Sequence, residues 1–215
     1  MTDTMLEIGR PQRQSRRGRA VEWFARNPVA FPLILICIVC LVVGTINPAF
    51  WQVANAFDIL RASVVRGLFA LGVLVVLAAG GLEVSFTAIA ALVMYSVTML
   101  VVNHAPGTGI VPILLMGAAG GTLLGMLNGA LVNRLRAPSL IVTIGTQYAF
   151  RGFLLTFIGT SLFMNIPASM DAFGQRTLLT LTNDAGFEVK LPAYVLILVV
   201  AAVVTWFILN RTLMG

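Results

Sequence analysis

The residues of this chain that could do chemistry are polar or ionisable side chains set within long apolar runs. Glu83 lies in the run GGLEVS at residues 80–85, between two glycines and Ser85. A carboxylate at the centre of a membrane-spanning helix costs about 2.5–3.5 kcal/mol on insertion scales, so it needs a reason to be there. Glycines that interrupt a helix beside polar groups are typical of a transport site or a moving element. A tight turn in which Glu83 caps the following helix explains the pattern equally well, because a helix N-terminus stabilises a carboxylate.

A second polar set recurs every four residues, at Thr143, Gln147 and Arg151. On a helix this spacing makes one polar stripe. Such a stripe either lines a path for a hydroxylated solute or makes structural hydrogen bonds between helices. We therefore take Glu83, Ser85, Gln147 and Arg151 as the candidate residues for a solute path or its gate.

Small residues define a third pattern, which predicts helix packing rather than chemistry. Glycines recur every four residues within the apolar segment at 110–132, at Gly117, Gly121, Gly125 and Gly129. In a membrane, small residues in register let two helices approach closely. Asn128 lies beside the last of them, and we expect it to hydrogen-bond across that contact.

Three charged residues open the apolar segment at 59–79. Asp58 and Arg61 are three residues apart and are expected to pair on one helix face. Arg66 lies deeper, where an arginine needs a water-filled cavity or a subunit interface rather than lipid.

The elements that position these residues are expected to be membrane-spanning helices. The chain has 215 residues, of which 59% are hydrophobic and only 10% charged, whereas soluble domains average about 25% charged residues. Apolar segments approach the ~20 residues that a spanning helix needs, and they are apolar on every face, unlike barrel strands. They lie at residues 29–46, 59–79, 84–102, 110–132, 140–158 and 191–209. The sequence predicts an all-α, polytopic integral membrane protein with about six transmembrane helices.

The distribution of charge predicts the orientation. The net charge is +6, and much of the excess lies in an arm at residues 1–27, with arginines at positions 10, 13, 16, 17, 19 and 26. A basic arm before a span is typical of a cytoplasmic end, whereas nucleic-acid binding needs a basic surface. Residues 28–215 then form the transmembrane domain, with both ends cytoplasmic. The loop at 160–190 lies outside, and its residues 167–173 fit a short interfacial helix. This loop is either a lid or docking surface or a solvated connector.

The sequence gives no sign of an enzyme. The one histidine, His104, has no partners for a catalytic triad or a metal site, and no phosphate-binding loop of the G-x-x-x-x-G-K-[ST] type is present. We expect no catalytic residue, no metal and no cofactor.

Several ordered blocks resemble the permease subunit of bacterial ABC importers for simple sugars, the ribose-type family. Glu83 stands where that family usually has aspartate, and Arg66 stands at a usually apolar position. The blocks span nearly all of residues 28–215 and comprise DILR at 58–61, GGLEVS at 80–85, GMLNG at 125–129, LIVTIGT at 140–146 and FRG at 150–152.

The resemblance implies a multi-pass protein of the bacterial inner membrane that forms the path for a simple sugar or sugar-like solute. It implies a second permease subunit, identical or different, cytoplasmic ATPase subunits that hydrolyse ATP, a periplasmic solute-binding protein and surrounding lipid. In that family the segment that meets the ATPase begins just after the tail of this sequence. We therefore expect the chain to match only the N-terminal part of such a permease, roughly two thirds, as a fragment or a degenerate subunit unable to transport alone.

Two other functions remain open from the residues alone. One is an ion- or proton-coupled secondary carrier that uses Glu83 as its coupling carboxylate at a broken helix. The other is a non-transporting membrane scaffold held together by its glycine face.

Overall fold

The computed structural model describes residue 24 and residues 26–159, 166–182 and 188–211. The chain divides into two compact units, Met1–Asn55 and Ala56–Gly215. The basic arm predicted at residues 1–27 lies almost entirely outside the described residues.

In the first unit, the apolar helix α2 (Ala30–Ile46) is followed by a short 3₁₀ helix, η1 (Pro48–Trp51). Asn47 ends α2, and its side chain accepts a hydrogen bond from the backbone N–H of Ala49 at 3.1 Å. The Trp51 indole lies directly against Gly44, where a Cβ atom would clash with the ring. The absence of a side chain at Gly44 therefore lets the turn fold back onto its own helix.

Each apolar segment predicted as a span contains a helix, and the last helix begins at Val195 rather than at Leu191, because Leu191 and Pro192 belong to a β-strand. The remaining ones are α3 (Val53–Ala78), α4 (Phe86–His104), α5 (Ile110–Leu135), α6 (Ser139–Phe153) with the π-helical turn η2 (Leu154–Ile158), and α8 (Val195–Arg211). Among the described residues, α3, α4, α5 and the continuous helix 139–158 are long and apolar enough to cross a membrane, and α2 and α8 are shorter, at 17 residues each. The fold is that of a polytopic helical membrane protein. The count of six spans and their orientation remain predictions.

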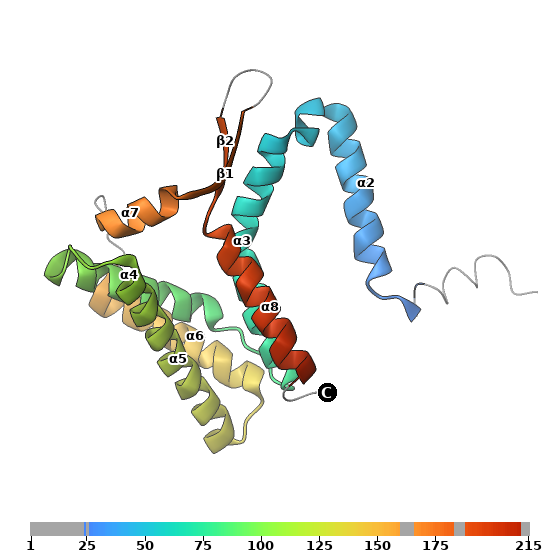
Figure 1. Ribbon diagram of the computed structural model, residues 1–215. Helices are drawn as coiled ribbons and strands as arrows, with labels where there is room; N and C mark the ends of the chain where they lie inside the picture. The colour runs from blue at the N-terminus through green and yellow to red at the C-terminus, as the bar shows by residue number, and fades with distance from the viewer. Residues whose placement is uncertain (1–23, 25, 160–165, 183–187, 212–215) are drawn as a thin grey trace, which may run out of the picture. The chain divides into compact units, whose positions relative to one another are not determined.

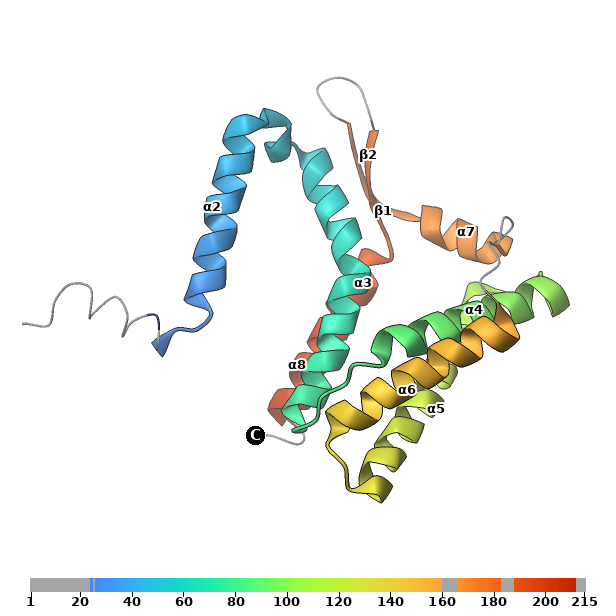
Figure 2. The ribbon, with the colours of Figure 1, turned by 180° about the vertical axis from the view of Figure 1, so that it is seen from behind.

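Helices α4, α5 and α6 pack side by side in the second unit (Figures 1 and 2). Their buried core joins Ala88 and Leu92 of α4 to Phe150 of α6 and Leu154 of η2. Gly120 of α5 faces α4 so closely that a Cβ there would lie 3.1 Å from a valine methyl group. Small residues thus allow these helices to approach each other in the way that membrane interiors favour.

The segment between α6 and α8 contains the one part of the fold that the sequence did not predict. The short helix predicted at residues 167–173 is present as α7 (Ala168–Gln175), and its place at a membrane interface stays a prediction. Strands β1 (Thr177–Thr182) and β2 (Glu188–Pro192) then form an antiparallel pair in which Thr180 faces Lys190. The hairpin adds a small sheet to the helical chain, and its connecting residues lie outside the described part.

Candidate functional site

The break between α3 and α4 is built by its glycines. Gly80 has a φ of +82°, in the left-handed region that favours glycine. Its N–H donates to the Leu77 carbonyl at 2.9 Å, and the N–H of Gly81 donates to the Val76 carbonyl at 3.0 Å. These two bonds form a Schellman motif, which ends α3 and satisfies its last carbonyl groups. The two glycines thus break the helix as predicted and form a turn between α3 and α4, and a transport role for this break stays a prediction.

The non-helical residues after the break are held by side chains at the start of α6. The Ser139 hydroxyl accepts the N–H of Leu82 at 2.8 Å. The Thr143 hydroxyl accepts the N–H of Val84 at 3.4 Å and lies 3.3 Å from the Leu82 carbonyl. Irregular backbone in a membrane protein is tolerated where neighbouring helices satisfy its polar groups. Ser139 and Thr143 therefore fix the segment that carries Glu83.

Glu83 is the centre of a polar cluster with Ser85 and Asn128. Glu83 Oε1 accepts the Ser85 N–H at 2.7 Å and the Ser85 hydroxyl at 2.6 Å. The Asn128 amide Nδ2 donates to Glu83 Oε2 at 3.2 Å and to the Ser85 hydroxyl at 2.7 Å. Ser85 is 0% and Asn128 2% exposed. The cluster thus ties the N-terminus of α4 to the middle of α5.

Glu83 satisfies both sequence explanations in part. It bonds the N–H of Ser85, the residue before α4, as a capping carboxylate does, and it also lies at an interrupted helix beside polar groups. Within the described part of the chain no basic side chain pairs with it. The amide oxygen of Asn128 is buried there without a hydrogen-bond partner.

Glu83 also lines a largely apolar groove of about 540 Å³ between α3, α4 and α5. Glu83 is the only charged residue in the groove lining. Three glycines of α5 form one wall of the groove, and mainly aromatic and aliphatic side chains of α3 and α4 form the rest. The volume lies in the range of small-molecule sites, at roughly 300–1,000 Å³. The arrangement offers one fixed hydrogen-bonding carboxylate at an apolar passage. The groove is lined by Gly117, Gly121, Gly125, Leu68, Phe69, Gly72, Val73, Val76, Glu83, Phe86, Ile89, Ala90, Val93 and Met94.

The other predicted path residues lie apart from this cluster. Thr143 is buried and reaches the Glu83 segment, but Gln147 is half-buried and Arg151 exposed. In the described residues neither of the latter two bonds to Glu83, Ser85 or Asn128. Their role in the path remains a prediction.

The glycine face also has an unexpected environment. A Cβ atom at Gly117, Gly121, Gly125 or Gly129 would meet no described atom within 4 Å. The predicted packing role of these four glycines stays a prediction. The close helix contacts observed are instead at Gly120 and at Gly67, where a Cβ would lie 2.7 Å from Leu198 of α8.

Sequence reasoning missed the place of Asn128 and Ser139 in the site. Asn128 was assigned to helix packing, yet its amide bonds to residues 43 and 45 positions earlier in the chain. Ser139 was not singled out. The four-residue spacing of Ser139 and Thr143, directly after Pro138, was the one available signal.

Comparison with known proteins decides the family. A family model described as "Branched-chain amino acid transport system / permease component" matches residues 55–215. This chain belongs to that family. It is therefore a multi-pass membrane protein of the permease type, whose homologues are transport components rather than enzymes.

Individual relatives carry the names of sugar importers. The ribose import permease protein of Bacillus subtilis is 30% identical over 190 residues, which cover 86% of this chain and 54% of that protein. The galactofuranose transporter permease protein of Escherichia coli is 30% identical over 201 residues, covering 88% and 54%. An autoinducer 2 import system permease protein of Enterobacter is 29% identical over 150 residues, covering 70% and 42%. No solved structure matches the chain.

The resemblance to the ribose-type permeases is thus confirmed, with a different extent. The chain spans about half the length of the curated relatives it matches, rather than the two thirds expected.

Proposed function

We propose that this chain forms part of the translocation path of an ATP-driven importer for a sugar-like solute, with Glu83, Ser85 and Asn128 at its gate. The observation that most supports this is the fixed carboxylate at an interrupted helix, facing the apolar groove. Within the described residues Glu83 Oε2 accepts a single bond, from Asn128 at 3.2 Å, so it retains capacity for a solute hydroxyl. Neutral hydroxylated solutes are oriented by a few such polar groups in an otherwise apolar site.

The complete importer would contain further subunits. We propose a second permease subunit beside this one, cytoplasmic ATPase subunits that hydrolyse the nucleotide, and a periplasmic binding protein that delivers the solute. The names of the matched relatives, all import or transport permeases, support this assembly. We place the chain in the bacterial inner membrane with both ends cytoplasmic, because Arg134, Arg136 and Arg211 then lie inside.

Two sets of predicted residues extend the proposal. Gln147 and Arg151 would continue the polar face of α6 beyond Thr143, along the path. The glycines at 117, 121, 125 and 129 leave an open face on α5 among the described residues, and three of them line the groove, so a further helix that packed against this face would close the groove.

A second candidate function is an ion-coupled carrier. It is favoured by one observation, the lack of a basic partner for Glu83 in the described part of the chain. A carboxylate without a counter-charge at a broken helix is a typical coupling group.

Uptake assays separate these functions. The assembled importer, purified with its co-purifying subunits and reconstituted, is tested with radiolabelled ribose, galactofuranose and leucine. We expect ATP-dependent sugar uptake that a protonophore leaves unchanged, and a fall of about tenfold in initial rate in Glu83→Ala, as expected for loss of about 1.4 kcal/mol. Glu188→Gln, an exposed carboxylate in the hairpin, is the matched control and should transport normally.

Three results would contradict the proposal. Uptake that needs no ATPase and collapses with the protonophore would identify the carrier. Leucine uptake without sugar uptake would show that the solute is an amino acid and that the proposed solute class is wrong. Equal rates in the Glu83 and Glu188 variants would remove Glu83 from the gate.

A further inference from the structure

A second cavity lies where α3, α7, the hairpin and α8 meet. Its volume is about 360 Å³. Its polar lining consists of hydrogen-bond donors, and no aspartate or glutamate of the described residues belongs to it. The polar side chains concerned are Arg61, Gln175, Arg176, Thr177 and Tyr194.

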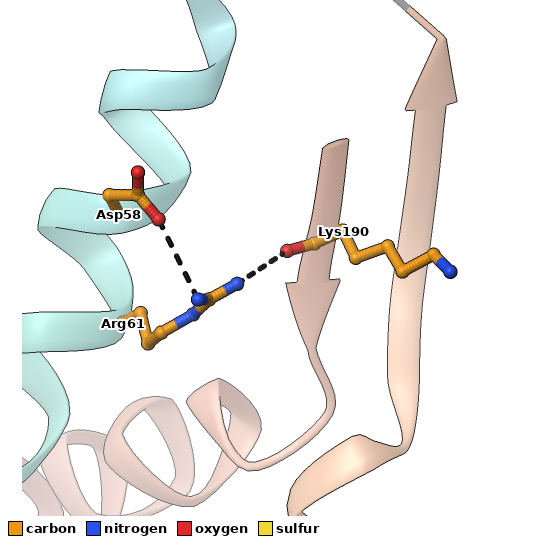
Figure 3. A network of polar contacts seen from close by, with 3 residues as sticks. All are labelled: Asp58, Arg61 and Lys190. Carbon is orange, nitrogen blue, oxygen red and sulfur yellow. Dashed lines mark hydrogen bonds and ion pairs between the residues drawn. The ribbon is translucent and has the colours of Figure 1, made fainter. Parts of the chain in front are cut away.

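Arg61 is held at this cavity by two weak contacts (Figure 3). Its Nη2 donates to the Lys190 carbonyl at 3.3 Å, and its Nη1 lies 3.7 Å from Asp58 Oδ1. The ion pair predicted from the spacing of Asp58 and Arg61 is thus confirmed. The two side chains are 48% and 69% exposed, and ion pairs this exposed contribute little. The Arg61 guanidinium can therefore exchange Asp58 for another anion at small cost.

Lys190 contributes its backbone rather than its charge. Figure 3 shows its carbonyl directed at Arg61 and its side chain extending the other way. The ammonium lies 2.9 Å from Glu188 Oε2, and this hydrogen bond, with the attraction between the charges, lowers the pKa of Glu188. The Lys190 ammonium therefore already has a carboxylate partner, in a pair about as exposed as that of Asp58 and Arg61.

Arg176 is the basic side chain of this cavity for which the described residues provide no charged partner. Its backbone carbonyl accepts the N–H of Ala193 at 2.8 Å, which fixes the start of β1 beside the start of α8. Its side chain has no ion pair or hydrogen bond within the described residues. Two guanidinium groups, from Arg61 and Arg176, thus line one cavity without a carboxylate between them.

If α3 crosses the membrane and its span ends at Ala78, the cavity comes to the level of the membrane surface. Helix α3 has 26 residues, whereas the hydrocarbon core needs ~20. Counting back ~20 residues from its end at Ala78 reaches Ile59, so Arg61 lies close to the boundary. Tyr194 directly precedes α8, the position at which tyrosine marks a membrane interface.

We propose that this cavity binds a phosphate group at the membrane surface through Arg61 and Arg176. Planar guanidinium groups bind phosphate oxygens in pairs, and Thr177 and Tyr194 add neutral donors, whereas the Gln175 amide already donates to Asp171 Oδ2 at 2.8 Å. An anionic lipid headgroup and a soluble phosphate present the same chemistry. The proposal does not depend on the transport function.

The test compares arginine variants of the full chain purified in detergent. Binding of phosphatidylglycerol and phosphatidylcholine is measured by native mass spectrometry, and binding of inorganic phosphate by calorimetry. Arg61→Gln and Arg176→Gln are compared with Arg66→Gln. Among the described residues the Arg66 guanidinium donates only to the Ala62 carbonyl of its own helix, at 3.3 Å. We expect each cavity variant to weaken binding about tenfold, and the control to bind as the wild type does.

The two probes also identify the source of the phosphate. Binding of phosphatidylglycerol without inorganic phosphate assigns a lipid headgroup, and the reverse assigns a soluble phosphate. Arg176→Lys keeps the positive charge but loses the planar guanidinium, so it should bind phosphate with intermediate affinity. This conservative variant shows whether weaker binding in the glutamine variants comes from the lost charge rather than from misfolding. The proposal is overturned if neither probe binds, if phosphatidylcholine binds as well as phosphatidylglycerol, or if Arg66→Gln weakens binding equally.

Discussion

Asn128 provides the sharpest test of the polar cluster, because one side chain carries the link between α5 and the Glu83 segment. Asn128→Ala removes the amide bonds to Glu83 Oε2 at 3.2 Å and to the Ser85 hydroxyl at 2.7 Å. A hydrogen bond to a charged group contributes about 1.5–3 kcal/mol and a neutral one about 1 kcal/mol. The change also removes an amide oxygen that is buried without a partner among the described residues, which returns about 1–3 kcal/mol. The expected net loss in free energy of unfolding is about 1–2 kcal/mol, close to the upper range of interhelical hydrogen bonds in membranes.

Unfolding in mixed dodecyl-sulfate micelles measures this loss directly. The matched control is Asn133→Ala, an asparagine on the same helix that is exposed and should change stability by less than about 0.5 kcal/mol. Asn128→Asp should destabilise more than alanine, because it places a second carboxylate beside Glu83. Equal stability of the Asn128→Ala and Asn133→Ala variants, or an aspartate variant as stable as the wild type, would refute the cluster as described.

Further predictions concern helix packing, the turn and the hairpin. Gly120→Leu should lower the free energy of unfolding by about 1–3 kcal/mol, because even a Cβ at this position would lie 3.1 Å from a side chain of α4. Gly117→Leu, where the space is open, should lower it by less. A larger loss in Gly117→Leu than in Gly120→Leu would contradict the α4–α5 contact. Gly80→Ala should cost about 1–2 kcal/mol through its φ of +82°, measured in the same micelles, and a neutral result would exclude the left-handed turn. The Glu188 pKa is lowered by Lys190 from its ordinary value of 4.5, so this pair stabilises the fold above that pH and loses its effect as pH falls through the folded pKa. Lys190→Met should return the Glu188 pKa toward 4.5 in an NMR titration, and an unchanged pKa would show that the pair does not form.

Local features of this protein were predictable from the sequence because neighbours along the chain determine them. Runs of about twenty apolar residues must satisfy their own backbone hydrogen bonds in lipid, and each of them contains a helix. Gly80 and Gly81 end α3 through backbone hydrogen bonds to carbonyl groups three and five residues earlier in the chain. Asp58 and Arg61 pair because three residues separate them on one helix.

Contacts between distant segments were decided only by the tertiary structure. The bonds from Asn128 to Glu83 and Ser85 join different helices, so no spacing along the chain indicates them. Four glycines in register pointed to one face of α5, yet Gly120 makes the close contact, because which face packs depends on where α4 lies. The hairpin was not predicted for the same reason. Its two strands are mostly exposed, and backbone hydrogen bonds between them define the hairpin. Segment type follows from local hydrogen bonding and hydrophobicity, whereas the partner of each polar group depends on the packing of the whole chain.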